Sequence, residues 1–240
     1  MSTPMVFLHG WGQSRQIWYQ QISAFPDALF LNLPGHGGSE EHDDWIKVIS
    51  EQLPASPSII VGWSLGGIIA MQLALKHPEK VRGLALISTT PSFCDRRDWN
   101  HGCQQEVFNA FENGTQENSA KTMSRFFMLM LQGDNISRSD YNQIAKAGID
   151  REYPPTQVTL TKGLNRLAAT DLRSVVSSIS TPALVMHGEQ DAIVPATAGT
   201  WLAGEIPHTT WQAFDNCGHA PFLTHPETFN ESLERWCQTI

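Results

Sequence analysis

The chain has 240 residues, a length typical of one α/β domain with a single core. Hydrophobic residues make up 41% and charged residues 17% of it, which excludes a disordered or fibrous protein. The formal net charge of -8 at pH 7 argues against a broad surface for nucleic acid or anionic lipid, because such surfaces need clustered Lys and Arg.

No stretch approaches the roughly 20 apolar residues that a membrane helix needs. The 4 cysteines have no metal-ligand spacing, and no motif indicates a nucleotide or flavin. We therefore expect a cytoplasmic protein with reduced thiols, no membrane contact, no metal and no cofactor.

Short apolar runs alternate with helical patterns along most of the chain. This alternation predicts an α/β fold with a mostly parallel sheet and helices on both faces. We expect strands at 5–8, 28–33, 58–62, 83–88, 182–187 and 209–214, and helices at 66–77 and 226–238.

The alternation stops between residues 92 and 170, where the sequence is helix-like. We expect this segment to be a helical insertion of three or four helices in a core domain formed by 1–91 and 171–240. Residues 91–170 contain 9 of the 16 Lys and Arg and 9 of the 24 Asp and Glu, so the insertion is neutral and the core carries the negative charge.

The pentapeptide Gly62-Trp63-Ser64-Leu65-Gly66 lies where an apolar strand runs into a helical pattern. In a nucleophile elbow a serine occupies a strained strand-to-helix turn, and flanking glycines prevent collisions with neighbouring elements. A glycine-rich turn with an incidental serine would have the same pentapeptide. The strand and helix on either side favour a nucleophile at Ser64.

A serine nucleophile needs a histidine base and a carboxylate that orients it. In this architecture the order along the chain is Ser, then Asp or Glu, then His, each after a later strand. Asp191 and His219 occupy those places. For the other nearby carboxylates, Asp171, Glu189 and Asp215, we expect capping or surface roles. We expect structural hydrogen bonds for the strand-end histidines His9 and His187, and packing for the Cys217 thiol.

Attack on a carbonyl also requires donors for the oxyanion, usually the amide after the nucleophile and one from an earlier loop. Leu65 N–H is the first candidate, and Trp11 N–H, within "FLHGWG", is the second. The loop around Trp11 would otherwise be only a tight turn with a buried tryptophan.

Six motifs together resemble the α/β-hydrolase superfamily. They are "FLHGWG", "LNLPGHGGS", "VGWSLGG", "HPEKVRGLALIST", "HGEQDAIVP" and "GHAPFLTHPE", and they span nearly the whole chain. Within the superfamily the chain is most similar to the carboxylesterases that act on the methyl ester of pimeloyl-acyl-carrier protein in biotin synthesis. The resemblance implies a Ser64, Asp191 and His219 triad with oxyanion or substrate contacts at Trp11 and Leu65.

The resemblance also implies that the insertion is a lid and that "RFFMLM" is the lid helix lining an acyl channel. Met123, Phe126, Phe127 and Met130 form one apolar stripe at helical spacing, which is equally compatible with packing of the lid onto the core. Basic lid residues of that family meet an acidic carrier protein, and the candidates for transient docking are Lys121, Arg125, Arg138 and Lys146.

We therefore expect a serine esterase, monomeric, that acts on the carrier-bound methyl ester and also on short-chain esters. Two alternatives remain at this stage. One is a hydrolase of another small-metabolite ester or carbon–carbon bond. The other is a ligand-binding protein with little turnover on the same scaffold.

Overall fold

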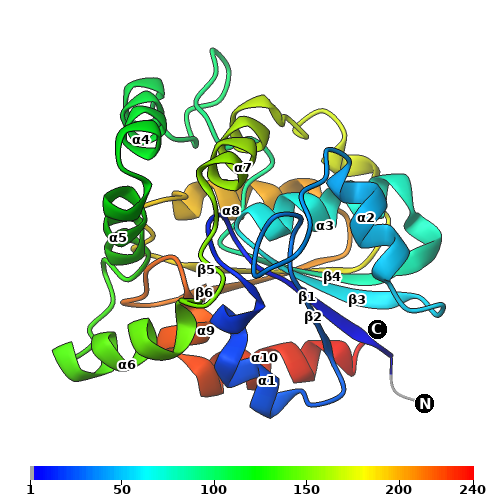
Figure 1. Cartoon of the computed structure of the whole chain (residues 1–240). Helices are drawn as coiled ribbons and strands as arrows, with labels where there is room; N and C mark the ends of the chain where they lie inside the picture. Colours follow the sequence, from blue (N-terminus) through cyan, green and yellow to red (C-terminus); the bar gives the residue numbers. More distant parts are fainter. Residues whose placement is uncertain (1–2) are drawn as a thin grey trace.

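The sheet of the protein has six strands, as the sequence predicts. A computed structural model describes residues 3–240, so residues 1 and 2 of the predicted core segment lie outside the described residues. The strands have the order β2-β1-β3-β4-β5-β6, and every neighbouring pair is parallel (Figure 1). Their bounds are β1 Met5–Leu8, β2 Leu29–Leu31, β3 Ser58–Trp63, β4 Val81–Ile87, β5 Ala183–Gly188 and β6 Thr209–Phe214.

The central strands are apolar on consecutive residues because both of their faces are covered. All residues of β3 and β5 are buried, whereas the edge strands β2 and β6 are partly exposed. The predicted strand ranges are confirmed to within two residues at each end, and β2 is two residues shorter than predicted at its carboxyl end.

Helices cover both faces of the sheet (Figure 1). On one face α3 contacts β3 and β4, and α8 contacts β5 and β6; on the other face α10 packs with α1 and α9. None of the helices within 3–240 is long and apolar enough to cross a membrane. The bounds in this core are η1 Arg15–Trp18, α1 Tyr19–Ala24, α2 Trp45–Gln52, α3 Leu65–Lys76, η2 Pro78–Lys80, η3 Val176–Ser178, α8 Ala196–Glu205, α9 Pro221–Thr224 and α10 Pro226–Cys237.

The connection between β4 and β5 contains four further helices and lies over the carboxyl ends of the strands (Figure 1). Its two ends meet where Leu172 N–H donates to Pro91 O at 2.9 Å. Local signals start several of these helices; Ser137 and Asp140, for example, form a capping box before α6. The helices are α4 Gln105–Glu117, α5 Ser119–Met130, α6 Arg138–Gly148 and α7 Gln157–Ala169.

Candidate active site

Ser64 occupies a strained turn between β3 and α3. Its φ of 55° lies in the left-handed region that non-glycine residues rarely adopt. Two hydrogen bonds fix the turn: Ser64 N–H donates to Ile87 O at 2.9 Å, and the Thr89 hydroxyl donates to Ser64 O at 2.7 Å. The backbone therefore holds the serine in one orientation, as a nucleophile elbow requires.

The flanking glycines are required by close backbone contacts. A Cβ at Gly62 would lie 2.5 Å from Gly66 O, and a Cβ at Gly66 would lie 2.3 Å from Leu8 O. Backbone atoms cannot move aside as a flexible side chain can. These contacts explain why small residues bracket the serine.

We expect Gly66→Ala to lower the free energy of unfolding by about 3 kcal/mol, because the added methyl group collides with the β1 backbone. Urea denaturation followed by circular dichroism measures this loss. The control is Gly204→Ala in α8, where nothing lies within 4 Å of the added Cβ. Equal stabilities of the two variants would contradict the steric explanation.

Asp191 and His219 lie together in the loops that follow β5 and β6. His219 Nδ1 is 2.7 Å from Asp191 Oδ2, and both side chains are fully buried. Because an ionised carboxylate only accepts hydrogen bonds, the proton is on Nδ1 and the lone pair of the neutral ring is on Nε2. His219 Nε2 has no hydrogen-bond partner among residues 3–240, Ser64 included.

Asp191 is ionised despite its burial. Burial alone raises the pKa of its carboxyl group. The facing imidazoles of His219 and His187 lower that pKa by a larger amount, so the pKa of Asp191 falls well below its ordinary value. The carboxylate is thus available to orient His219 and to stabilise an imidazolium.

The backbone of His219 is held by two contacts that the sequence did not reveal. His219 N–H donates to Met130 O at 2.9 Å, at the end of α5. Trp63 Nε1–H donates to His219 O at 2.9 Å, from the residue before the serine. A backbone carbonyl has no sequence signature, and the sequence does not show which acceptor the Trp63 indole will meet.

The two candidate oxyanion donors are backbone N–H groups near the serine, and neither is used in another hydrogen bond among the described residues. Leu65 is the first residue of α3, so its N–H has no partner within the helix. Among residues 3–240 no acceptor is recorded for Trp11 N–H either. The Trp11 indole is fixed in place, since its Nε1–H donates to Leu160 O at 2.9 Å and its ring meets that of Phe126 edge to face.

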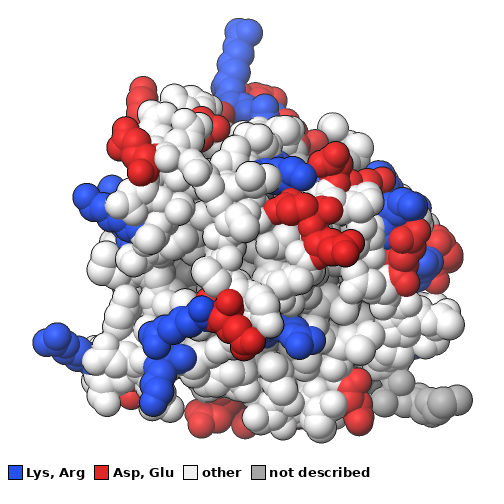
Figure 2. Space-filling model, in the orientation of Figure 1, with Lys and Arg blue, Asp and Glu red and all other residues white. Residues whose placement is uncertain are grey.

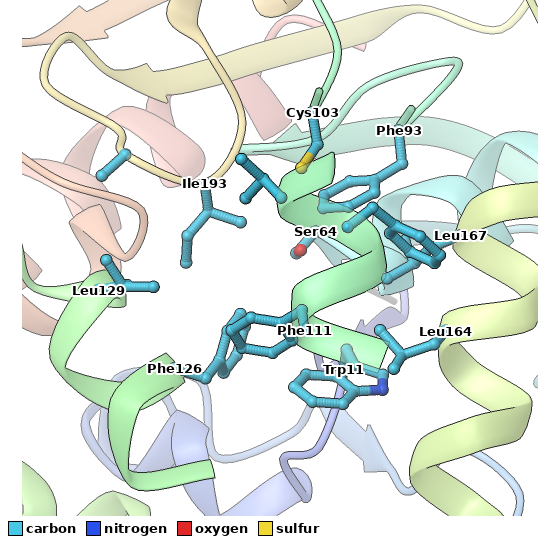
Figure 3. A pocket seen from close by; sticks show the side chains of 13 residues that line it. Trp11, Ser64, Phe93, Cys103, Phe111, Phe126, Leu129, Leu164, Leu167 and Ile193 are labelled. Carbon is cyan, nitrogen blue, oxygen red and sulfur yellow. The ribbon is translucent and has the colours of Figure 1, made fainter. Parts of the chain in front are cut away.

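An apolar pocket opens above Ser64 (Figure 3). Figure 3 shows the Ser64 hydroxyl pointing into the pocket, surrounded by aromatic and aliphatic side chains from the core and from the insertion. No charged side chain contributes to the lining within the described residues. Such a pocket favours an uncharged chain over an ionised group. Its lining includes Trp11, Phe93, Cys103, Phe111, Phe126, Leu129, Leu164, Leu167 and Ile193.

Of the three α5 residues expected to meet substrate, the structure brings Phe126 to this pocket. Phe127 instead packs edge to face against Tyr141 of α6, and the Met130 side chain is fully buried without contributing to the lining. The apolar stripe spans a wide arc of the helix, so its members face different neighbours. Phe93 and Cys103, from the loop before α4, and Phe111 from α4 had no sequence signal as lining residues.

The candidate docking residues lie on the surface of the insertion. Lys121 and Arg125 are exposed on α5, and Arg138 is exposed at the start of α6. No ion pair is recorded for these three side chains within residues 3–240, so their charges face solvent.

Asp134, Cys217 and His225 are the one group in the described chain with donor atoms that could hold a metal ion, all within 4.8 Å of one another. Thr224 links them, donating to Asp134 Oδ1 at 2.7 Å and lying 3.0 Å from His225 Nδ1. Burial raises the pKa of the Cys217 thiol, which keeps it neutral. The Thr224 hydroxyl therefore connects Asp134, which follows α5, with His225, which follows α9.

The other carboxylates considered from the sequence do not reach His219. Asp171 pairs with Arg173 at 2.8 Å, and Glu189 and Asp215 are exposed. His9 is buried and accepts a hydrogen bond from Leu33 N–H at 3.0 Å. Of the histidines expected to be structural, only His187 contacts the site, through Asp191 Oδ2 at 3.1 Å.

The fold and the strand-end residues define the class of protein as an α/β hydrolase. Residues 3–226 match the alpha/beta hydrolase fold family. Solved structures agree on the fold: an esterase from Exiguobacterium antarcticum superposes with a TM-score of 0.88 at 21% identity, covering 99% of this chain and 92% of that one.

Relatives identify the family more closely. The pimeloyl-[acyl-carrier protein] methyl ester esterase of Nitrosomonas europaea is 36% identical over 94% of this chain and 92% of its own length. The protein of the same name from Vibrio parahaemolyticus is 33% identical over 98% and 94%. The chain belongs to this family of carboxylic ester hydrolases with the α/β-hydrolase fold.

Proposed function

We propose that this enzyme is a serine carboxylesterase that hydrolyses the methyl ester of pimeloyl-acyl-carrier protein, the substrate in the names of its relatives. The observation that carries the proposal is the Ser64 hydroxyl in an apolar pocket, with the buried Asp191–His219 pair at the ends of neighbouring strands. Ser64, Asp191 and His219 all belong to this chain, so the proposed enzyme acts as a monomer, by a mechanism that calls for no cofactor.

In this mechanism Ser64 Oγ attacks the ester carbonyl while His219 Nε2 takes its proton. The oxyanion accepts hydrogen bonds from Leu65 and Trp11 N–H. Collapse of the tetrahedral intermediate breaks the bond to the methoxy oxygen, which receives the proton from His219 and departs as methanol. Water then attacks the acyl-enzyme with His219 as base, and the carboxylic acid is released from Ser64.

The apolar lining supports selection of the ester over its product. The pimeloyl chain is a run of methylene groups, and the neutral methyl ester can enter the pocket without losing the hydration of a charge. The product carboxylate would be desolvated without a cationic partner there, since no charged side chain of the described residues lines the pocket. The pocket thus binds the substrate more strongly than the product.

We assign residues 92–170 the role of a lid over the core domain of 1–91 and 171–240. In this assignment α4, α5 and α7 wall the pocket through Phe111, Phe126 and Leu164. Removing the segment would leave Ser64 open to solvent.

The proposed docking surface for the carrier protein consists of Lys121, Arg125 and Arg138. Figure 2 shows positively charged side chains over the side of the molecule where α5 and α6 lie. The rest of the chain carries the negative charge, so an acidic carrier protein is attracted to this side and repelled elsewhere. The proposal also places the enzyme in the cytoplasm, together with its carrier protein.

Reversing two of these charges, Lys121→Glu with Arg125→Glu, is expected to lower kcat/KM for the carrier-bound ester about tenfold at low salt, because rim charges mainly steer association. The difference from the wild type should shrink as ionic strength rises. Turnover of p-nitrophenyl butyrate should stay unchanged.

The matched control also reverses two exposed charges, Arg82→Glu with Arg235→Glu. Arg82 lies near the amino end of β4 and Arg235 near the end of α10, so neither belongs to α5 or α6. An equal loss on the carrier-bound ester in this variant would show that only the net charge matters and would contradict the docking surface.

The substrate itself is tested by comparing kcat/KM for the carrier-bound methyl ester with that for free dimethyl pimelate. The proposal predicts a clear preference for the carrier-bound ester. Equal values would be consistent with a serine esterase but would show that the enzyme does not recognise the carrier protein.

A further inference from the structure

The second histidine on Asp191, His187, is fully buried at the end of β5. Its Nε2 lies 3.1 Å from Asp191 Oδ2 and 2.9 Å from Val194 O. The Nε2–H group donates to Val194 O, which is an acceptor only. The same N–H group lies against the carboxylate oxygen that accepts from His219, so its positive end faces that negative charge.

The tautomer of His187 follows from its other nitrogen. Nδ1 is buried and has no hydrogen-bond partner among residues 3–240. Protonation there would bury an N–H group without an acceptor, which is costly. His187 is thus a neutral imidazole whose single proton points at the site.

With His187 in place, both oxygens of the Asp191 carboxylate are in contact with donor groups. Oδ1 accepts from Ile193 N–H at 2.8 Å and from Val194 N–H at 2.9 Å. Oδ2 accepts from His219 at 2.7 Å and lies 3.1 Å from the Nε2–H group of His187. Rotation of the carboxylate would break these hydrogen bonds and move Oδ2 away from His187.

The surroundings of His187 are shaped around its ring. A Cβ at Gly199 of α8 would lie 2.4 Å from His187 Nδ1, and the Trp211 ring of β6 lies 6.4 Å away between centroids. Neither element brings a charge to the ring. The titratable groups that lower the pKa of Asp191 are His219 and His187. The charge of Asp191 in turn contributes to the raised pKa of the Cys217 thiol.

We propose that His187 is a positioning residue for catalysis, which fixes the orientation of Asp191 and, through it, the basicity of His219. The inference rests on the proposed function, in which Asp191 orients the base. Without the His187 N–H group, the negative charge of Oδ2 is less compensated and attracts the proton of His219 more strongly. The imidazolium of His219 is then stabilised, and its neutral, active form requires a higher pH.

The test compares His187→Phe, which keeps the ring volume and loses the donor, with His187→Gln, whose amide nitrogen can replace Nε2–H. For p-nitrophenyl butyrate, His187→Phe is expected to lower kcat about tenfold and to move the acidic midpoint of the kcat/KM profile upward by about half a pH unit. His187→Gln should restore most of both values.

Gly199→Ala is an independent variant that leaves His187 intact and displaces its ring. It is expected to change kcat and the midpoint in the same direction, and it replaces His187→Phe if that variant fails to fold. Wild-type values in folded His187→Phe or Gly199→Ala protein would overturn the inference, as would a lower kcat with an unchanged midpoint. Asp191→Asn separates the two proposals: if it retains activity, the triad itself is wrong.

Discussion

Ser64→Ala is expected to lower kcat/KM for p-nitrophenyl butyrate by about 10⁴-fold or more, because no other described side chain in the pocket is placed and activated as a nucleophile. The residual rate would come from the oxyanion donors and from substrate binding. Initial rates at matched enzyme concentration measure the loss. Circular dichroism should show unchanged folding, since alanine only removes one hydroxyl.

Ser88→Ala is the matched control for this variant. Ser88 is also buried, also has a positive φ, at 45°, and its hydroxyl has no hydrogen-bond partner in the described chain. Alanine at either position therefore has similar conformational consequences. The control should keep kcat/KM within about twofold of the wild type, and a comparable loss in both variants would argue against a nucleophile at Ser64.

Asp191→Asn is expected to lower kcat about 10⁴-fold while leaving the fold intact. The asparagine carbonyl must take the Oδ1 position, where it accepts from Ile193 and Val194 N–H. Its NH₂ group then replaces Oδ2 and faces His219. To accept from that NH₂ group His219 must move its proton to Nε2, and the lone pair that receives the Ser64 proton is lost.

The rate at neutral pH and the melting temperature together test this result. Glu189→Gln is the control, because Glu189 lies in the same loop with its side chain exposed to solvent. Its activity should stay within about twofold of the wild type. A larger loss from Glu189→Gln than from Asp191→Asn would show that Glu189, and not Asp191, orients His219.

The fold could be predicted from the sequence because its signals are local. Buried strands such as β3 and β5 are continuous apolar runs, and the order of serine, aspartate and histidine relative to those strands follows from the chain itself. The structure brings Asp191 and His219 together at 2.7 Å, as that order predicts. Their catalytic roles remain predictions.

Other parts of the site depend on tertiary contacts that no local pattern encodes. The stripe on α5 has one period, yet Phe126 and Phe127 face different neighbours once α6 is packed beside it. Met130 contributes a carbonyl to His219, which any residue at that position could offer. From the sequence His187 is an ordinary strand-end histidine, because its contact with Asp191 depends on the folded conformation of the β5–α8 loop.

The most direct test of the account is the initial rate of hydrolysis of pimeloyl-acyl-carrier protein methyl ester by the wild type and by Ser64→Ala, with methanol and the free acid quantified. The account predicts efficient turnover by the wild type that is lost in the variant. Wild-type protein that hydrolyses p-nitrophenyl butyrate and leaves the carrier-bound ester intact would contradict the proposed substrate. Undiminished turnover by Ser64→Ala would contradict the mechanism.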